Sequence, residues 1–168
     1  MEDIYLLHGN IASEEVSFVR KLLATNFVYE VKKNEPDAGE TDGNVHVVIK
    51  KYDILTFGPG FELVDELQSP FQKMKKVINY YSSIGKLVSY LAIDISIYYN
   101  FKTFSLLIIT SPDEFIKGLN LINNELTLIA EDAKQDDCIK VKLINENLEI
   151  VNCNELKDMY TVIRDSSL

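Results

Sequence analysis

The stretch IDISIYYNFKTFSLLIIT, residues 93–110, decides the fold of this chain. Residues 93–99 alternate between apolar side chains and polar or tyrosine side chains, which is the period of a strand with one buried face. Asn100 then turns the chain, and residues 103–110 form a more continuously apolar run. The stretch therefore predicts two consecutive strands joined by a turn in the middle of the 168-residue chain.

Signals before this stretch, taken together with its first strand, predict a β-α-β-β-α-β order of elements up to Tyr99. The expected strands cover residues 3–8, 27–31 and 44–50, with a continuation past a bend at 52–57. The expected helical segments cover 14–25, a turn or two at 61–67, and 70 to about 91. Ser13 has the residue type of a helix N-cap, and Gly85 allows a break inside the third helical segment.

Signals after residue 110 are weaker. The run Ser111-Pro112-Asp113-Glu114 has the spacing of a capping box, which predicts a short helix to residue 117. Residues 119–133 fit either a hairpin about Asn123-Asn124 or a helix over 124–133, and the helix is favoured. One face of a C-terminal amphipathic helix is indicated by the spacing of Leu156, Met159, Tyr160 and Ile163.

A second hairpin is expected before that C-terminal helix. With Asn145-Glu146 as its two-residue turn, Val141 faces Ile150, so apolar meets apolar across the strands. A register with the turn at Glu146-Asn147 keeps the same faces and is the alternative. The same register places Cys138 opposite Cys153 at the open end of the hairpin. A disulfide there is geometrically conceivable, but the reducing conditions of a cytosol predict free thiols.

The order of elements predicts an α+β fold with a mainly antiparallel sheet and helices packed on one face. The first half has the ferredoxin-like order β-α-β-β-α-β, and the second half reads β-α-α-β-β-α. At this length we expect one domain over residues 1–168, with sub-halves 1–100 and 101–168 as the alternative division.

Composition excludes several classes of function. The chain has 17 Lys and Arg against 26 Asp and Glu, a net charge of −9, and its arginines are Arg20 and Arg164. Nucleic-acid binding needs clustered cations and is not expected. The acidic start Met1-Glu2-Asp3 is unlike a signal peptide, and no apolar run has the length of a bilayer span. We therefore expect a cytoplasmic protein that binds neither nucleic acid nor membrane.

No catalytic or metal-binding motif is complete. The strand that ends in His8-Gly9 resembles the oxyanion-loop strand of α/β hydrolases, but the chain lacks the G-x-S-x-G nucleophile elbow of that family. The spacing of His8 and His46 does not match a metal site. The acidic segment 35–42 does not match a calcium-binding loop, and Gly58-Pro59-Gly60 lacks the lysine of a P-loop. The sequence predicts no catalytic residue, no metal site and no cofactor.

The acidic charge favours a protein that works by binding another protein. The candidate contacts with a basic partner are four carboxylates, Glu35, Asp37, Glu40 and Asp42. In size and charge the chain is similar to two broad bacterial groups, the immunity proteins that neutralise toxins and the acidic secretion chaperones. We therefore expect a non-catalytic protein that neutralises or escorts a basic partner.

The alternative is a small enzyme or ligand-binding domain with a pocket near two histidines. Its candidate residues are His8, Ser13 and His46. The histidines would converge if their strands were neighbours, as the first and third strands are in a ferredoxin-like order. A pocket that brings both histidines within hydrogen-bonding reach of a carboxylate would favour this alternative, and histidines on opposite faces of the sheet would count against it.

Overall fold

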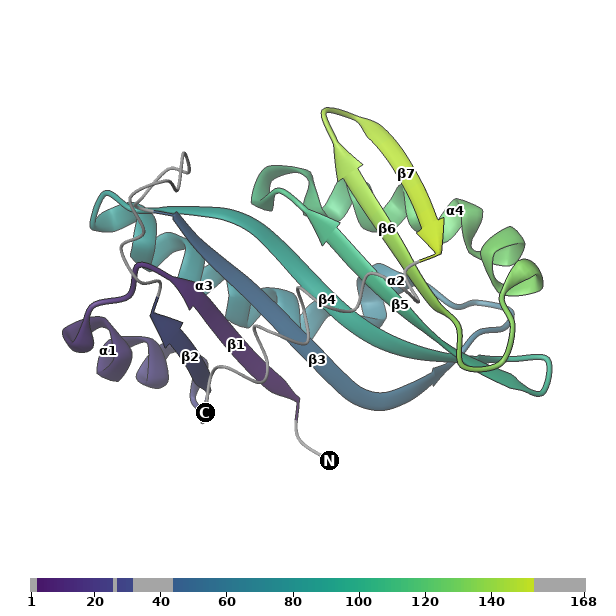
Figure 1. The fold of residues 1–168 in the computed structure, drawn as a ribbon, viewed down its shortest axis with the longest axis horizontal. Coiled ribbons are helices and arrows are strands. Elements are labelled where there is room, and N and C mark those ends of the chain that lie inside the picture. Colours follow the sequence, from purple (N-terminus) through teal and green to yellow (C-terminus); the bar gives the residue numbers. More distant parts are fainter. Residues whose placement is uncertain (1–2, 26, 32–43, 153–168) are drawn as a thin grey trace.

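The computed structural model describes residues 3–25, 27–31 and 44–152. Within them, seven strands form one sheet in the order β2-β1-β3-β4-β5-β6-β7 (Figure 1). The strands are β1 (Ile4–Gly9), β2 (Val28–Val31), β3 (Asn44–Thr56), β4 (Leu87–Tyr99), β5 (Lys102–Thr110), β6 (Cys138–Ile144) and β7 (Asn147–Asn152). The helices are α1 (Ser13–Leu23), α2 (Leu63–Glu66), α3 (Gln68–Ser83) and α4 (Phe115–Asp132), with a 3-10 turn, η1 (Pro112–Glu114), before α4. The acidic segment 35–42, Cys153 and the expected C-terminal helix lie outside the described residues.

The sheet alternates between parallel and antiparallel pairing. The pairs β1–β2, β3–β4 and β5–β6 are parallel, whereas β1–β3, β4–β5 and β6–β7 are antiparallel. The α+β class is confirmed, but the sheet is mixed rather than mainly antiparallel. β1 and β3 are neighbours, as the ferredoxin-like order implies. However, β2 pairs directly with β1 as an ordinary parallel β-α-β unit, so the split arrangement of that fold is absent from the described sheet.

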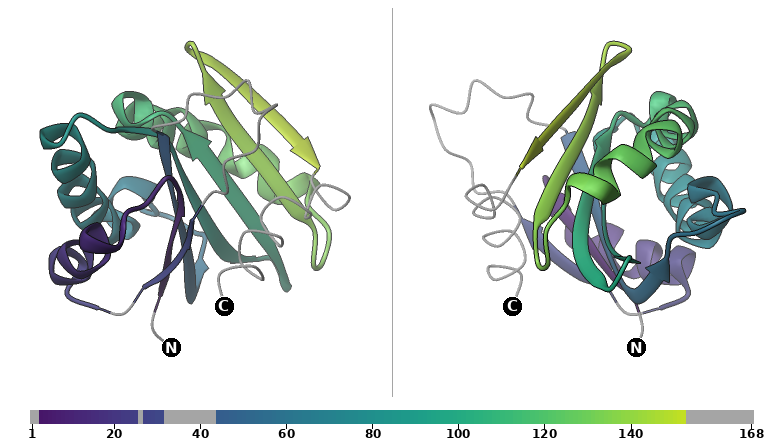
Figure 2. Two further views of the ribbon diagram at one scale, coloured as in Figure 1. Left: turned by 60° about the vertical axis from the view of Figure 1, so that its left-hand side comes forward. Right: turned by 90° about the vertical axis from the view of Figure 1, so that its right-hand side faces the viewer.

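The described helices all pack on one face of this sheet (Figure 2). The β1-to-β2 and β3-to-β4 connections begin on strands that run antiparallel to each other, and they cross the sheet in opposite directions. Because both the strand direction and the crossing direction are reversed, the two crossovers have the same handedness. The β5-to-β6 connection starts from a strand that runs parallel to β1 but steps the other way. Its hand is therefore opposite, although connections between parallel strands are almost always right-handed. This change of hand keeps α4 on the same face as α1 and α3.

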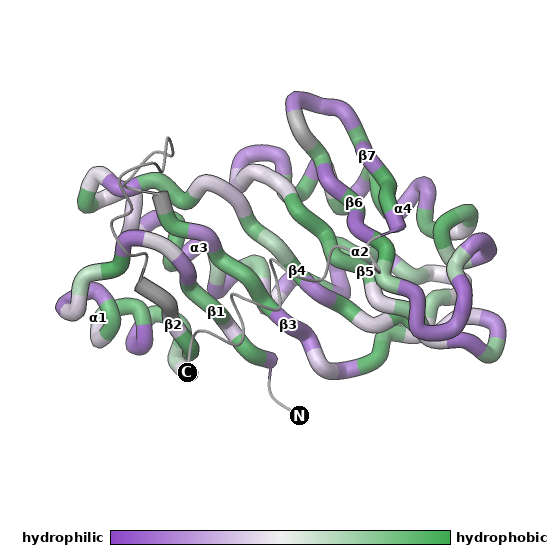
Figure 3. The backbone as a smooth tube through the Cα atoms, in the orientation of Figure 1, coloured by the Kyte–Doolittle hydropathy of each residue, from purple (hydrophilic) through white to green (hydrophobic). Residues whose placement is uncertain are grey.

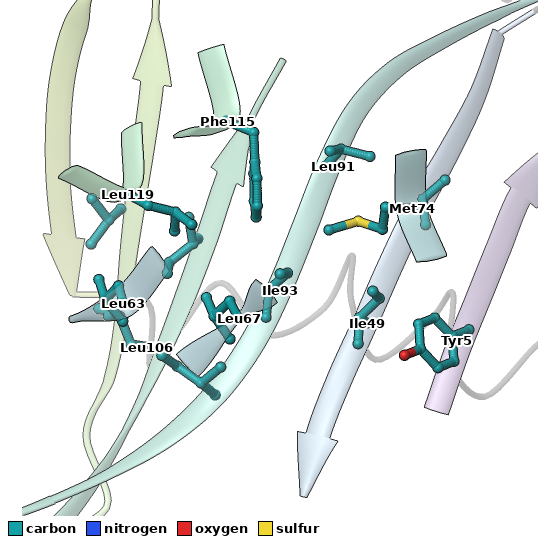
Figure 4. Close-up of a cluster of buried hydrophobic side chains, with 14 of the residues drawn as sticks. Tyr5, Ile49, Leu63, Leu67, Met74, Leu91, Ile93, Leu106, Phe115 and Leu119 are labelled. Atoms are coloured by element: carbon teal, nitrogen blue, oxygen red, sulfur yellow. The ribbon is translucent and has the colours of Figure 1, made fainter. Parts of the chain in front are cut away.

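The main hydrophobic core lies between this face and the helices. Ile93, Ile95 and Ile97 of β4 are fully buried there, as their alternation predicts. Phe71 of α3 stacks on Phe115 of α4 with ring centroids 4.9 Å apart, so the two helices share one core. Figure 4 shows side chains from the strands and helices converging in this layer. Apolar residues are concentrated in the central strands, and the β6–β7 turn is polar (Figure 3).

The opposite face of the sheet, which we call the helix-free face, carries no helix among the described residues. Cross-strand pairing aligns an apolar row on it, formed by Val28, Leu6, Val48, Ala92 and Ile109. The last four of these are buried and form a second, smaller cluster with Val28 packed against them.

The third helical segment ends earlier than its apolar pattern indicates. α3 ends at Ser83, and β4 begins at Leu87, inside the range expected to be helical. Gly85 has φ +79°, and the N–H of Lys86 donates to the carbonyl of Tyr81 at 2.8 Å. This is a Schellman ending, in which the glycine takes the left-handed position after the helix. Gly85 is therefore the C-terminal stop of α3 rather than a weak point within it.

The ambiguous segment after Ser111 forms one long helix. η1 and α4 run from Pro112 to Asp132, so the hairpin about Asn123-Asn124 is wrong and the helix begins before residue 124. Ser111 makes no side-chain capping bond, so the expected capping box does not form. Asn123 is instead used in a tertiary contact, because its Oδ1 accepts the N–H of Leu63 at 3.0 Å.

The C-terminal hairpin has the expected register. Val141 pairs with Ile150, and the turn is Asn145-Glu146. Cys138 begins β6 and is disulfide-bonded, so the expectation of a free thiol is not met there.

One ion pair ties α1 to the segment after α3. Glu15 of α1 is buried and pairs with Lys86, whose Nζ also donates to the carbonyl of Asn10 at 2.8 Å. Burial, and then the charge of Glu15, raise the pKa of the neighbouring Tyr81 hydroxyl. Removing Lys86 would leave the buried Glu15 carboxylate without its charged partner, so the pair helps fix how α1 packs against the end of α3.

Gly118 allows α4 to approach the sheet closely. A Cβ at this position would lie 2.9 Å from Cγ2 of Thr110 and 3.3 Å from Cδ2 of Leu143. Both neighbours are buried, and the threonine side chain is branched and stiff. Glycine has a low helix propensity and so destabilises α4 itself, but its lack of a Cβ allows close contact with β5 and β6.

We expect Gly118→Ala to lower the free energy of unfolding by about 1–3 kcal/mol, because overpacking outweighs the gain in helix propensity. Urea denaturation of the purified chain measures this change. The matched background is Thr110→Ser, which removes Cγ2 and keeps the hydroxyl. The Gly118→Ala penalty should be smaller in that background, and an equal or larger penalty there would contradict the assigned contact.

Candidate functional site

The two histidines lie side by side on the helix-free face. His8 of β1 and His46 of β3 are direct cross-strand partners, and their rings stack with centroids 5.9 Å apart. On the next strand, Tyr90 of β4 stacks on His46 at 4.1 Å. We call these three rings the aromatic row. The two histidines share one face of the sheet, so the arrangement that would count against a site at them does not occur.

Ser13 is not part of this arrangement. It is the exposed first residue of α1, and Ala12 takes the N-cap position without a side-chain capping bond. The helix begins at Ser13, one residue before the expected start at residue 14, because the N–H of Glu15 already donates to the carbonyl of Ala12 at 3.0 Å. Since α1 packs on the other face of the sheet, Ser13 does not join the histidines. The predicted partner-binding residues Glu35, Asp37, Glu40 and Asp42 lie outside the described residues.

The turn between β4 and β5 presents an exposed aromatic side chain. Asn100 and Phe101 form a two-residue turn in which both residues have positive φ, 49° and 63°. Phe101 is 91% exposed, the highest value among the described large apolar side chains. Glycine is the usual residue at the second position of such a turn, because left-handed backbone crowds a Cβ. Phe101 therefore gains neither packing nor a relaxed backbone from its place in the fold.

The turn between β6 and β7 has the same backbone geometry with a different side chain. Asn145 and Glu146 have φ values of 48° and 68°. Glu146 forms an ion pair with Lys117 of α4 at 2.7 Å, and the hydrogen bond from Lys117 holds the pKa of the Glu146 carboxyl below its usual value. This turn geometry accepts a polar residue at its second position, so it does not explain the aromatic ring of Phe101.

Hydrogen bonds fix the base of the β4–β5 hairpin. On the β5 side, Nζ of Lys102 donates to the carbonyls of Glu131 and Ala133 at the end of α4. On the β4 side, the N–H of Phe57 donates to the carbonyl of Tyr98 at 3.0 Å. The turn therefore projects from a base that is held on both sides, and these hydrogen bonds define the position of the Phe101 backbone.

Acidic residues surround this base. The segment between α4 and β6 lies alongside the start of β5, because the N–H of Asp136 donates to the carbonyl of Thr103 at 2.8 Å. The segment and the end of α4 supply four carboxylates, Glu131, Asp132, Asp136 and Asp137, against two cations, Lys102 and Lys134. The local balance is therefore negative. We call Phe101 together with these four acidic residues the hairpin-tip surface.

Neither a metal-binding cluster nor a membrane-spanning helix occurs in the described part of the chain. No group of three or more His, Cys, Asp or Glu side chains is placed to hold a metal ion within the described ranges. No helix in that part of the chain is long and apolar enough to cross a membrane.

Comparison of the chain with protein-family models, with curated proteins and with solved structures finds no match.

We expect Phe101→Gly to raise the free energy of unfolding by about 1 kcal/mol, because it relieves the left-handed backbone and loses no packing. Urea denaturation of the variant and the wild type measures the difference. Phe101→Ala is the matched control, since it removes the ring but keeps the crowded Cβ. Its stability should equal that of the wild type, and a clear loss would mean that the ring packs in the folded state.

Proposed function

We propose that the protein works without catalysis, by binding a basic partner protein through the hairpin-tip surface. One observation carries this proposal, the full exposure of Phe101 at a turn position where folding favours glycine. Aromatic residues that become buried at the centre of an interface are common hot spots of binding energy. The neighbouring carboxylates would attract a basic partner and exclude acidic ones.

The energetics of the hairpin support this role. Full burial of a phenylalanine side chain in a partner would contribute about 1.5–3 kcal/mol. Little of that gain would be lost in ordering the hairpin, because Lys102 and Phe57 already hold its base. The strain at Phe101 is a cost in the free protein that only an intermolecular contact can offset. A non-catalytic protein of this kind would neutralise or escort its partner, and Glu35, Asp37, Glu40 and Asp42 are further predicted contacts.

Affinity capture with matched baits tests the proposal. The wild-type chain, Phe101→Ala and Glu146→Ala would each be used to capture proteins from the source organism, with quantitative mass spectrometry as the readout. We expect one basic protein to be enriched on the wild-type and Glu146→Ala baits. Its affinity for purified Phe101→Ala should be at least ~30-fold weaker, the loss typical of a hot-spot residue. Glu146→Ala controls for changes to an equivalent turn elsewhere.

Salt dependence provides the second criterion. Exposed charges are screened at high ionic strength, so the affinity of the purified partner should fall as salt is added. Replacing Asp132 and Asp136 by asparagine should reduce that dependence. A partner that binds Phe101→Ala as tightly as the wild type, or one whose own surface is acidic, would refute binding through the hairpin-tip surface.

The second candidate function is small-ligand binding on the side of the sheet that carries the aromatic row. The adjacency of His8, His46 and Tyr90 favours it. Rings stacked in this way turn their faces toward each other and present their edges outward, and the polar atoms on those edges suit a small polar ligand.

A further inference from the structure

A pocket opens beside the aromatic row, at the end of the sheet where β5 and β6 terminate. Its volume is about 320 Å³, and Tyr90, which stacks on His46, forms part of its wall. Ile109 and Leu143 supply further apolar wall, from the ends of β5 and β6. Ligands of sheets with helical crossovers commonly bind at the carboxyl ends of parallel strands, which is where this pocket lies.

Two opposite charges line the pocket without neutralising each other. Lys142 forms no ion pair or hydrogen bond with any described residue, although Glu149 is its cross-strand partner. Glu114 lines the same pocket, where its carboxylate accepts a long hydrogen bond of 3.4 Å from the N–H of Glu146 and also interacts with the charge of Lys117. A purely anionic ligand would oppose Glu114, and a purely cationic ligand would oppose Lys142. A ligand that carries both charges satisfies both residues.

Hydroxyl groups in the wall also lack partners. Oγ1 of Thr110 and Oγ of Ser89 are buried and have no hydrogen-bond partner among the described residues. Buried polar atoms are usually paired, so two orphaned hydroxyls in one wall are unusual for a site with a purely structural role. They add hydrogen-bonding capacity next to the charged pair.

We propose that this pocket binds a free α-amino acid with an apolar side chain. Its carboxylate would pair with Lys142, its ammonium group with Glu114, and its side chain would pack on Ile109 and Leu143. The volume lies at the lower end of the usual range for ligand pockets, roughly 300–1,000 Å³, so it suits a ligand of this size better than a peptide. The inference rests on the second candidate function and is independent of protein binding at the hairpin-tip surface.

Isothermal titration of the full chain with L-leucine, N-acetyl-L-leucine and L-leucinamide tests the proposal. The acetyl group removes the ammonium charge, and the amide removes the carboxylate charge, while the side chain stays the same. We expect L-leucine to bind at least ~10-fold more tightly than either derivative, the size of effect expected from losing one charge-assisted hydrogen bond.

Two variants test which residue recognises each charged group of the amino acid. Lys142→Met should bind L-leucine and L-leucinamide equally, because it no longer recognises the carboxylate. Glu114→Gln should bind L-leucine and N-acetyl-L-leucine equally, because it no longer recognises the ammonium group. Both residues are half-buried at the surface, and thermal unfolding of each variant verifies that it folds.

The results of these titrations distinguish the pocket from the hairpin-tip surface. Phe101→Ala should bind L-leucine as the wild type does, since that residue lies at the opposite end of β5. No binding of L-leucine, isoleucine, valine, methionine or phenylalanine would overturn the inference, and so would equal binding of leucine and its derivatives. Neither result would affect capture of a partner through Phe101, so the two proposals fail separately.

Discussion

The parallel pairing of β3 with β4 is the constraint on which the rest of the structure depends. Both strands have thirteen residues, and their register runs from Asn44 opposite Leu87 to Thr56 opposite Tyr98. β3 then pairs with β1, and β4 pairs with β5, so every other strand is added outward from this pair. Two features with proposed functions depend on it directly. His46 and Tyr90 meet because β3 and β4 are neighbours, and the Phe101 turn is the continuation of β4.

Much of the fold could be predicted because it follows from local pattern. Alternation in residues 93–99 and the polar turn at Asn145-Glu146 each produce the expected strands. In the second hairpin, apolar pairing defines which faces meet, and the structure selects the turn at Asn145-Glu146 over the one at Glu146-Asn147. The misplaced end of α3 has a local cause. Apolar residues continue past Ser83, but Gly85 ends α3 through backbone geometry that an apolar pattern does not report. The parallel pairing was missed because strand order depends on long-range packing rather than on spacing within each strand.

Only part of the candidate site could be predicted, because its residues come together through the pairing of strands. His8 and His46 could be expected to meet once their strands were placed side by side. Tyr90 joins them only through an irregularity in register between Val45 and His46, which the sequence does not reveal. Phe101 did leave a signal, since the turn has two residues and lacks the glycine usual at its second position. Lys142 could not be recognised as a ligand-binding residue from the sequence, because the hairpin register places it opposite Glu149 and so predicts an ion pair. Only the structure shows that this ion pair does not form.

The position of Phe101 has a consequence for how this chain would change over generations. A residue that is both fully exposed and held in left-handed backbone contributes nothing that selection for folding would preserve. Random substitution would replace it with glycine or asparagine, which fit the turn at lower cost. If folding alone mattered, an aromatic ring at this turn would be a transient state. Its persistence in related chains would therefore record selection for a contact made outside the molecule, independently of what that contact is.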